Sequence, residues 1–429
     1  MRTIRFIDLF AGLGGTRIGF EQACMELGVK TKCVFTSEIK EYAVDIYKHN
    51  FKNDEVSGDI TKIEANMIPD FDFLLGGFPC QAFSSAGKRH GFNDTRGTLF
   101  FDVARILKEK KPMGFLLENV EGLVNHDNGN TLRTILNVLK ELGYIVSYNV
   151  LNAENFGIPQ SRKRIYMVGT KVEKIDIYDF NTSRATFGDI QEFGLNPVET
   201  KFTKQLLKLF SPSELEGKAI KDKRGGIDNI HSWDLELKGS LTKQQKYLMS
   251  ILLKERRKKK WAEIKQIKWM DGMPLTLEEI YSFYNETSLL NLKEILDDLV
   301  EKKYLRYEHP KDIVITEDGR NVRQHDTTKE KGYNIVAGKL SFEFNKILGK
   351  TSIAPTIVAT EADRIGVIDT NKIRRMSERE CLRLFGFPEW YKSNISHKNL
   401  YDLIGNTVVV PVIKDVSLRL VKPLLEILP

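Results

Sequence analysis

Residues 4–15 have the sequence IRFIDLFAGLGG, and this stretch decides the fold. Its first half, 4–9, is an apolar run typical of a buried strand, and 10–15 is a glycine-rich turn. The amphipathic stretch that follows, with Ile18 and Phe20, predicts a helix. A strand, a glycine turn and a helix form a cradle for a nucleotide, because glycine lets the backbone approach a ligand closely. The spacing is not a true G-x-G-x-x-G, so the loop alone is weak evidence.

The same alternation of short apolar runs and amphipathic stretches continues to about residue 180. Further strands are predicted at 33–35, 71–75, 115–120 and 165–168, and a turn at Gly76-Gly77 follows the second of these runs. This alternation predicts an α/β fold with a parallel sheet. Open sheets of this kind place their reactive groups at the strand ends.

Reactive side chains follow these predicted strands. Cys80, in Pro79-Cys80-Gln81, precedes a polar loop that suits a nucleophile, although a lone cysteine is more often a small buried hydrophobe. Glu38 ends the strand at 33–35, where an acidic residue commonly binds ribose hydroxyls. Asp59 ends the next short segment, and it is equally well interpreted as a functional carboxylate or as a helix cap. Glu118 ends an apolar strand, which costs free energy unless the carboxylate is used.

Five motifs, taken in chain order, resemble those of the cytosine-C5 DNA methyltransferases of the bacterial HhaI-like kind. They are the glycine loop at 10–15, Pro79-Cys80-Gln81, Glu118-Asn119-Val120, the Gln-x-Arg-x-Arg element at 160–164 and the Gly-Asn-x-Val-Val element at 405–409. Gly97-Thr98-Leu99-Phe100, 374–380 and 386–388 also resemble the family. The resemblance covers roughly the first 170 and the last 75 residues. It implies a Rossmann-like, S-adenosylmethionine-dependent methyltransferase domain with a second, smaller target-recognition domain.

The resemblance also implies a mechanism. Cys80 is expected to add to carbon 6 of cytosine, which makes carbon 5 nucleophilic enough to accept a methyl group. Glu118 is expected to hydrogen-bond ring nitrogen 3 and the exocyclic amine, and burial would raise its pKa for that task. Arg164 resembles the arginine that contacts the ring carbonyl, and Arg162 the one that steadies the catalytic loop. From the residues themselves, either arginine would favour the Cys80 thiolate.

S-adenosylmethionine is the cofactor that the resemblance implies. Phe10 is expected on the adenine, Glu38 on the ribose and Asp59 on the adenine amine. Leu99 lines the pocket, and Pro79 and Asn406 flank the methionine end. Ile39 stands where relatives often have tryptophan, which leaves one stacking contact open. The other expected cofactor-binding residues are Gly12, Leu13, Gly14, Gly15, Ile60 and Val408.

The resemblance and the change of pattern together divide the chain into three parts. Residues 1–181 are the expected catalytic and cofactor-binding domain, 182–394 the target-recognition domain, and 395–429 a segment that returns to the catalytic domain. Within 182–394, helices are predicted at 275–284 and 289–303, and a hairpin joins strands at 304–307 and 313–315. These elements resemble a winged-helix module over about 241–319. It is equally well interpreted as a DNA-contacting element or a structural insertion.

The composition fits a polyanionic partner. The 429 residues carry a net charge of +7, with a sequence pI near 8.9. The basic run at 254–261 is either a solvated helix face or a phosphate-contacting surface. Four widely spaced cysteines without a Cys-x-x-Cys pair argue against a zinc site and a disulfide framework, and no metal is expected. No signal peptide or long apolar segment is visible, so we expect a cytoplasmic, nucleoid-associated bacterial protein without membrane contact.

The expected function is methyl transfer to a cytosine flipped out of a specific duplex DNA sequence. The loop at 84–95 would close over the base, and whether Ala86 or another residue fills the vacated space is open. A restriction–modification system with a cognate endonuclease is the expected setting. The alternatives are an RNA cytosine methyltransferase and a catalytically silent DNA-binding regulator. A nicotinamide-dependent dehydrogenase leaves Cys80, Glu118 and the arginines unexplained.

Overall fold

The computed structural model describes residues 3–52, 54–79, 99–221, 229–268, 272–316, 321–336 and 342–427. It divides the chain into two compact units. Unit 1 comprises Met1–Leu195, Leu348–Ile365 and Arg375–Pro429, and unit 2 comprises Asn196–Ile347 and Gly366–Arg374. These units are defined by their internal contacts, whereas the domains predicted at 1–181, 182–394 and 395–429 are defined by role. The division by role stays a prediction.

Unit 1 contains a six-stranded sheet in the order β2-β1-β3-β4-β6-β5. Its strands are β1 (Thr3–Leu9), β2 (Lys30–Ser37), β3 (Phe73–Gly77), β4 (Gly114–Val120), β5 (Ile145–Asn152) and β6 (Lys163–Thr170). The neighbours among β1 to β4 pair in parallel, whereas β6 runs antiparallel to both β4 and β5. The predicted α/β fold is confirmed, but the wholly parallel sheet is wrong. Only η7 (Ala153–Asn155) and a short loop join β5 to β6, which is too short for a helical crossover.

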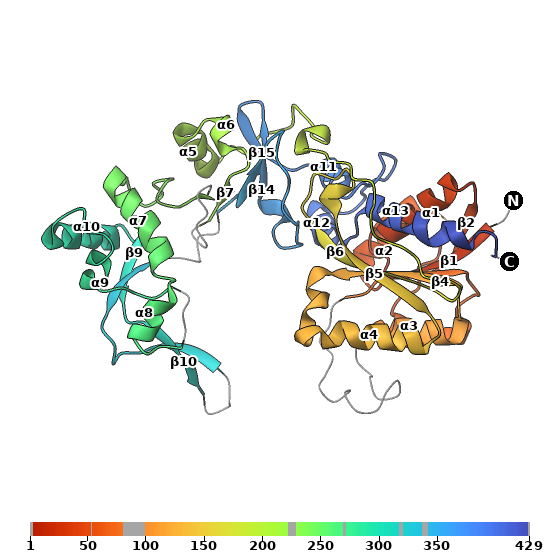
Figure 1. Cartoon of the computed structure of the whole chain (residues 1–429). Helices are drawn as coiled ribbons and strands as arrows, with labels where there is room; N and C mark the ends of the chain where they lie inside the picture. The colour runs from red at the N-terminus through yellow and green to blue at the C-terminus, as the bar shows by residue number, and fades with distance from the viewer. Residues whose placement is uncertain are drawn as a thin grey trace. The chain divides into compact units, whose positions relative to one another are not determined.

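Unit 1 also contains α-helices. They are α1 (Gly15–Glu26), α2 (Glu41–Asn50), α3 (Leu99–Lys110), α4 (Asn130–Glu141), α11 (Glu378–Arg383), α12 (His397–Asn406) and α13 (Val410–Val421). The short 3-10 turns are η1 (Ile60–Lys62), η2 (Ala65–Met67), η5 (Glu121–Val124), η6 (His126–Gly129), η8 (Phe187–Asp189), η9 (Ala362–Arg364) and η10 (Lys422–Leu424). Figure 1 shows α3 and α4 on one face, and α1 with the C-terminal α13 on the other. None of the helices in the described ranges is both long and apolar enough to cross a membrane.

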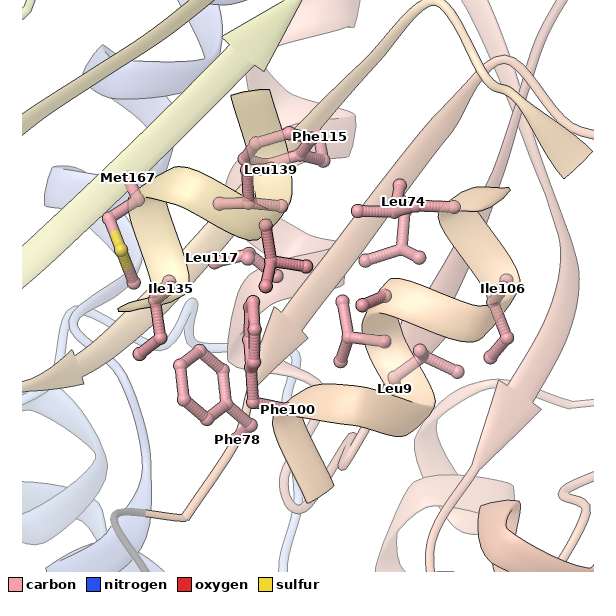
Figure 2. Close-up of a cluster of buried hydrophobic side chains, with 14 of the residues drawn as sticks. Leu9, Leu74, Phe78, Phe100, Ile106, Phe115, Leu117, Ile135, Leu139 and Met167 are labelled. Carbon is pink, nitrogen blue, oxygen red and sulfur yellow. The ribbon is translucent and has the colours of Figure 1, made fainter. Parts of the chain in front are cut away.

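The core under one face of the sheet comes from alternating apolar residues on the strands and the inner sides of α3 and α4. Figure 2 shows Leu9, Leu74 and Leu117 of the sheet facing Phe100 and Ile106 of α3. All of these side chains are at most 1% exposed. Burial of this kind fixes the carboxyl ends of the strands relative to one another, because well-packed cores tolerate little displacement.

The predicted turn at Gly76-Gly77 is wrong, because β3 continues through both glycines. Gly76 pairs with Leu117 and Gly77 with Glu118 of β4. The longer strand brings Phe78 and Pro79 to the same edge of the sheet as Glu118. The ladder to a buried neighbouring strand overrides the local turn preference of two glycines.

Unit 2 contains two buried clusters. One lies about the sheet β15-β14-β13-β7-β8, and the other lies among helices and the pair β9–β12. Its helices are α5 (Lys201–Leu209), α6 (Pro212–Leu215), α7 (Lys243–Glu255), α8 (Lys259–Ile264), α9 (Leu277–Tyr281) and α10 (Leu289–Glu301). Its strands, with some ends in unit 1, are β7 (Ala219–Ile220), β8 (Asn229–Ile230), β9 (Leu305–Glu308), β10 (Lys311–Ile315), β11 (Asn321–His325), β12 (Gly332–Ile335), β13 (Lys346–Leu348), β14 (Ile365–Asp369) and β15 (Lys372–Arg375).

The winged-helix-like region has the predicted helices but a different strand pairing. Helices α9 and α10 fall within the predicted segments, and both predicted strands exist as β9 and β10. They do not pair with each other, since β9 pairs with β12 and β10 with β11. The predicted hairpin is therefore wrong. The strand that completes β9 comes from residues 332–335, beyond the predicted end of the module at 319.

Candidate active site

A cavity of about 520 Å³ opens in unit 1 where the carboxyl ends of β1, β2, β3 and β4 meet. The link between α12 and α13 forms a further part of its wall. Most of the predicted site residues line it: Phe10, Gly12, Gly15, Glu38, Ile39, Asp59, Ile60, Pro79, Leu99, Glu118, Arg162, Arg164, Asn406 and Val408. Cys80, Ala86 and the loop at 84–95 lie outside the described residues.

The glycine loop shapes one wall through backbone conformations that glycine adopts easily. Gly12 and Gly14 have φ values of 51° and 74°, and Phe10 also has a positive φ, of 58°. A Cβ added to Gly15 would lie 2.9 Å from Cγ2 of Val408, so only glycine allows this approach. Leu13 and Gly14 do not line the cavity. Gly14 caps α1 instead, and the Leu13 carbonyl accepts a hydrogen bond from the Tyr391 hydroxyl.

Glu38 is held at the cavity edge by backbone donors. Its Oε2 accepts the N–H of Gly12 at 2.9 Å, and its Oε1 accepts those of Ile39 and Lys40 at 2.8 and 2.9 Å. This arrangement ties the end of β2 to the glycine loop. The neighbouring Ile39 is 69% exposed and presents an apolar surface beside that carboxylate.

Asp59 caps a short turn and also lines the cavity, and its contact with a cofactor stays a prediction. It caps η1, since its Oδ1 accepts the backbone N–H of Thr61 at 3.1 Å and the Thr61 hydroxyl at 2.7 Å. These hydrogen bonds lower the pKa of Asp59. The same side chain lines the cavity as an anion.

Glu118 and Arg164 form a largely buried pair on neighbouring strands. Arg164 Nε lies 3.2 Å from Glu118 Oε1, and their side chains are 13% and 10% exposed. Desolvation raises the pKa of Glu118, against the opposing charges of Arg164 and Arg162. The register of β4 and β6 brings the two residues together, because Val120 pairs with Arg164 and Glu118 with Tyr166. Glu118 can hold or release a proton at this edge of the sheet, and Arg164 can donate hydrogen bonds beside it.

Arg162 occupies a different position from Arg164. It is 2% exposed, and its guanidinium donates to the carbonyls of Ile357, Gly405 and Thr407 at 2.8 to 3.3 Å. Burial lowers the pKa of Arg162 to about 10, so it remains a cation at neutral pH. Arg162 therefore fixes the segment that carries Asn406 and Val408. Its Nε has no acceptor among the described residues.

Two other contacts at the cavity were not predicted. The Asn119 amide donates to the Phe78 carbonyl at 2.8 Å, which joins the ends of β3 and β4 just before Pro79. Asp402 Oδ2 accepts from Lys40 Nζ and from the Tyr42 hydroxyl, each at 2.6 Å, across 360 or more residues of sequence. Asn119 stands inside the Glu-Asn-Val motif, which was the available signal, whereas no local pattern marks Asp402.

Comparison with known proteins places this arrangement in a family. The family model for the C-5 cytosine-specific DNA methylase matches residues 4–422. The type II methyltransferase M.NlaIV of Neisseria lactamica is 56% identical over 431 residues, covering 99% of this chain and all of the relative. M.NgoBV of Neisseria gonorrhoeae is 55% identical, covering 99% and 100%. A putative DNA modification methyltransferase encoded within an E. coli prophage has a similar fold, with a TM-score of 0.51, 19% identity and 99% of each chain covered.

Proposed function

Because this chain belongs to the family of C-5 cytosine-specific DNA methylases, we propose a role in methyl transfer for each side chain of the cavity. The chain is a DNA (cytosine-5)-methyltransferase that uses S-adenosylmethionine. The observation that carries the assignment of roles is the buried Glu118–Arg164 pair beside Pro79, at the carboxyl edge of the sheet.

The cavity fits S-adenosylmethionine in size and in the chemistry of its walls. About 520 Å³ is ample for a ligand of this class, and pockets of this size usually combine apolar walls with a few polar groups. We assign the adenine to Phe10, Ile39, Ile60 and Leu99, its amine to Asp59 and the ribose to Glu38. Bound there, S-adenosylmethionine supplies an electrophilic methyl group.

The methionine end belongs to the glycine loop and the Arg162-bound segment. Gly12 and Gly15 let the backbone approach the ligand, while Pro79, Asn406 and Val408 border the same end. Leu13 and Gly14 support the loop rather than contact the ligand. The unpaired N–H groups at the start of α1 suit the methionine carboxylate, because a helix N-terminus favours negative charge.

In the catalytic step, the Cys80 thiolate adds to carbon 6 of the flipped cytosine, and carbon 5 takes the methyl group. Loss of the carbon-5 proton then expels the thiolate and restores the ring. Glu118, whose pKa is raised by burial, hydrogen-bonds nitrogen 3 and stabilises the charge that develops on the ring. Arg164 holds Glu118 and donates to the ring carbonyl. The Nε of Arg162, which has no acceptor among the described residues, fits the predicted task of steadying the loop at 84–95.

Duplex DNA is the substrate, and we propose that the enzyme belongs to a restriction–modification system with a cognate endonuclease acting on the same sequence. The type II relatives at up to 56% identity support this setting, in the cytoplasm at the nucleoid. They also argue against an RNA substrate and against a silent regulator. Sequence choice is proposed to lie between residues 182 and 353, within the predicted target-recognition domain.

The test is a trapping experiment with duplex DNA that contains 5-fluorocytosine. Fluorine cannot leave as a cation, so the enzyme should remain covalently attached after methyl transfer when S-adenosylmethionine is present. The variant Cys80→Ala is expected to form no denaturant-stable complex. A complex in that variant would overturn the role of Cys80, and trapping on tRNA but not on DNA would favour the RNA alternative.

A further inference from the structure

A two-stranded ribbon extends from the core of the helical part of unit 2. Its first half is the pair β9–β12, in which Leu305, Tyr333 and Ile335 are buried against the helices. Its second half is the pair β10–β11, and every residue of β11 is exposed. The Asp326 N–H donates to the Pro310 carbonyl at 2.8 Å and joins the halves. Figure 1 shows β10 at the end of this part of the chain, beyond the label of α8.

One face of the β10–β11 ribbon carries basic and amide side chains. Successive residues of a strand point to opposite faces, and directly paired residues share a face. Register therefore places six residues on this face, which we call the basic face: Lys311, Ile313, Ile315, Asn321, Arg323 and His325. None of them is a carboxylate. Ile315, at the end of β10, is 71% exposed.

The opposite face of the ribbon is mostly exposed, since Val314, Val322 and Gln324 on it are all exposed. Asp312 lies on it, and its Oδ1 accepts the backbone N–H of Lys268 at 3.1 Å, from the segment after α8. The same oxygen accepts the N–H of Ile313. The contact with Lys268 ties the start of β10 to the segment after α8. The basic face differs from the opposite face in its charge, since the opposite face carries Asp312 and no cation.

Helix α10 directly precedes the strands of the winged-helix-like region, but the charge of its exposed side does not suit DNA. Its exposed side includes Lys293, Glu294, Asp297 and Glu301. Lys293 Nζ lies 2.6 Å from Asp297 Oδ2, so that pair is neutral and the two glutamates leave the side negative. A negative surface repels phosphates. The usual insertion of this helix into the major groove is therefore disfavoured.

Several cations of the basic run at 254–261 are paired with glutamates. Lys259 pairs with Glu263 at 3.2 Å, and Lys258 and Lys260 both pair with Glu255. Arg256 is 4% exposed and donates to Asn334. Its charge is thus partly neutralised within the run, and it is not one solvated helix face because α7 ends at Glu255.

We propose that the β10–β11 ribbon, through its basic face, lies in a groove of the duplex DNA substrate. This inference rests on the proposed action on duplex DNA and adds a role for the winged-helix-like region. The major groove accepts a two-stranded ribbon. Arg323 and Asn321 are of the types that read bases, Lys311 suits a phosphate, and Ile315 provides an apolar contact at the exposed end.

The first test is the salt dependence of DNA affinity for Lys311→Ala combined with Arg323→Ala. Loss of the Lys311 phosphate contact should reduce the slope of log affinity against log salt by about 0.9, which corresponds to about 8-fold weaker binding at 0.1 M salt. Loss of Arg323 should weaken binding further. The control removes two exposed lysines of unit 1, Lys140→Ala with Lys422→Ala, and should leave the slope unchanged. An equal effect in control and ribbon variant, or no effect in either, overturns the proposal.

The second test separates the ribbon from α10. Glu294→Gln combined with Glu301→Gln should leave affinity unchanged, whereas an increase would place α10 on the DNA and overturn the proposal. A photocrosslinking p-benzoylphenylalanine at position 315 should attach to duplex DNA, and at position 294 it should not. Tritium transfer from S-adenosylmethionine to duplex DNA by the unmodified enzyme is measured in parallel. If tritium is transferred but the ribbon variant binds DNA normally, only the role of the ribbon is refuted. If no tritium is transferred to duplex DNA, the proposed function is refuted as well.

Discussion

At the scale of single residues, the surroundings lower the pKa of one carboxyl group at the cavity and raise the pKa values of two others in and beneath it. Hydrogen bonds from Thr61 lower the pKa of Asp59, whose side chain is partly exposed. Desolvation raises the pKa of Glu118 despite two nearby arginines. Asp8, beneath the glycine loop, has no exposed surface, and burial raises its pKa to about 7. The same chemical group thus serves as anion or acid according to its surroundings.

Glu118→Gln should reduce the single-turnover rate of methyl transfer by about two to three orders of magnitude, since one transition-state hydrogen bond is lost. It should leave S-adenosylmethionine affinity nearly unchanged. In the unmodified enzyme the rate should fall as pH rises through the raised Glu118 pKa, because the proton donor is lost. The variant should lack this fall.

The matched control for that experiment is Glu121→Gln, which changes an exposed glutamate of η5 outside the cavity. It should retain both the rate and the pH profile. A near-normal rate in Glu118→Gln would remove Glu118 from the mechanism.

Asp8→Asn should stabilise the protein above pH 7. Between the ordinary pKa of 3.8 and the folded value of about 7, the folded state binds a proton that the unfolded state has lost. Stability of the unmodified protein therefore falls across this window and stays low above it. Asparagine keeps the Thr16 hydroxyl as a hydrogen-bond donor to Oδ1 and carries no charge.

The measurement is urea unfolding from pH 4 to 8. The curve for Asp8→Asn should be flatter than that of the unmodified protein and should lie above it at pH 8 by roughly a few kcal/mol. Asp45→Asn, at an exposed position of α2, should reproduce the unmodified curve. Parallel curves for Asp8→Asn and the unmodified protein would contradict the buried acid.

At the scale of elements, the closest helix packing in unit 1 joins the two ends of the chain. Helix α13 lies against α1 where Gly19 removes a side chain from the contact. An added Cβ there would lie 2.7 Å from Ile413 and 2.8 Å from the Val410 carbonyl. This contact positions the preceding segment, with Val408, against Gly15 of the glycine loop. A helix interface thus sets one wall of the cavity.

Gly19→Ala should destabilise the protein although alanine favours helices. The propensity gain is about 1 kcal/mol, whereas overpacking of a tight contact typically costs about 1–3 kcal/mol. S-adenosylmethionine affinity should also fall, because the α13 side of the cavity shifts. Thermal unfolding and calorimetric binding measure the two effects.

Gly122→Ala provides the control, since nothing lies within 4 Å of a Cβ added there. It should be close to neutral in both measurements. Unchanged stability of Gly19→Ala would show that the α1–α13 interface can relax.

At the scale of the whole molecule, the chemistry and the proposed sequence choice lie in different compact units. The described residues that line the cavity all belong to unit 1. Most of the region between 182 and 353, where we place sequence recognition, belongs to unit 2. Separate cores let one unit vary without disturbing the other, since each buries its own apolar surface.

Single substitutions of arginine, lysine, asparagine and glutamine across 182–353 should relax or redirect the methylated sequence at some positions. Each good base contact is worth roughly 1–3 kcal/mol of discrimination. The methyl-transfer rate on the best remaining site should change much less. Sequencing the methylated cytosines left by each variant gives the result, and changes that map only to the loop at 84–95 would refute this division.

The sequence by itself determined the α/β class, the glycine cradle, the helices of the winged-helix-like region and the motifs that indicate the family. These signals are local, because a strand, a turn and a helix each follow from the spacing of neighbouring residues. The side chains at the ends of β1, β2, β3 and β4 were predictable for the same reason. Parallel strands bring their carboxyl ends to one edge of the sheet.

Only the tertiary structure decided which distant segments meet. In the structure, β6 runs antiparallel to β4, and β9 pairs with β12. Strand β3 continues through Gly76 and Gly77, and Asp402 contacts Lys40. Strand pairing depends on the lengths of the connections between strands and on which backbone donors and acceptors still lack partners. The sequence around a single residue specifies neither of these. Arg162 shows the same limit. Its motif was visible, but its anchoring on Gly405 and Thr407 exists only because folding buries a cation among carbonyls some 245 residues away.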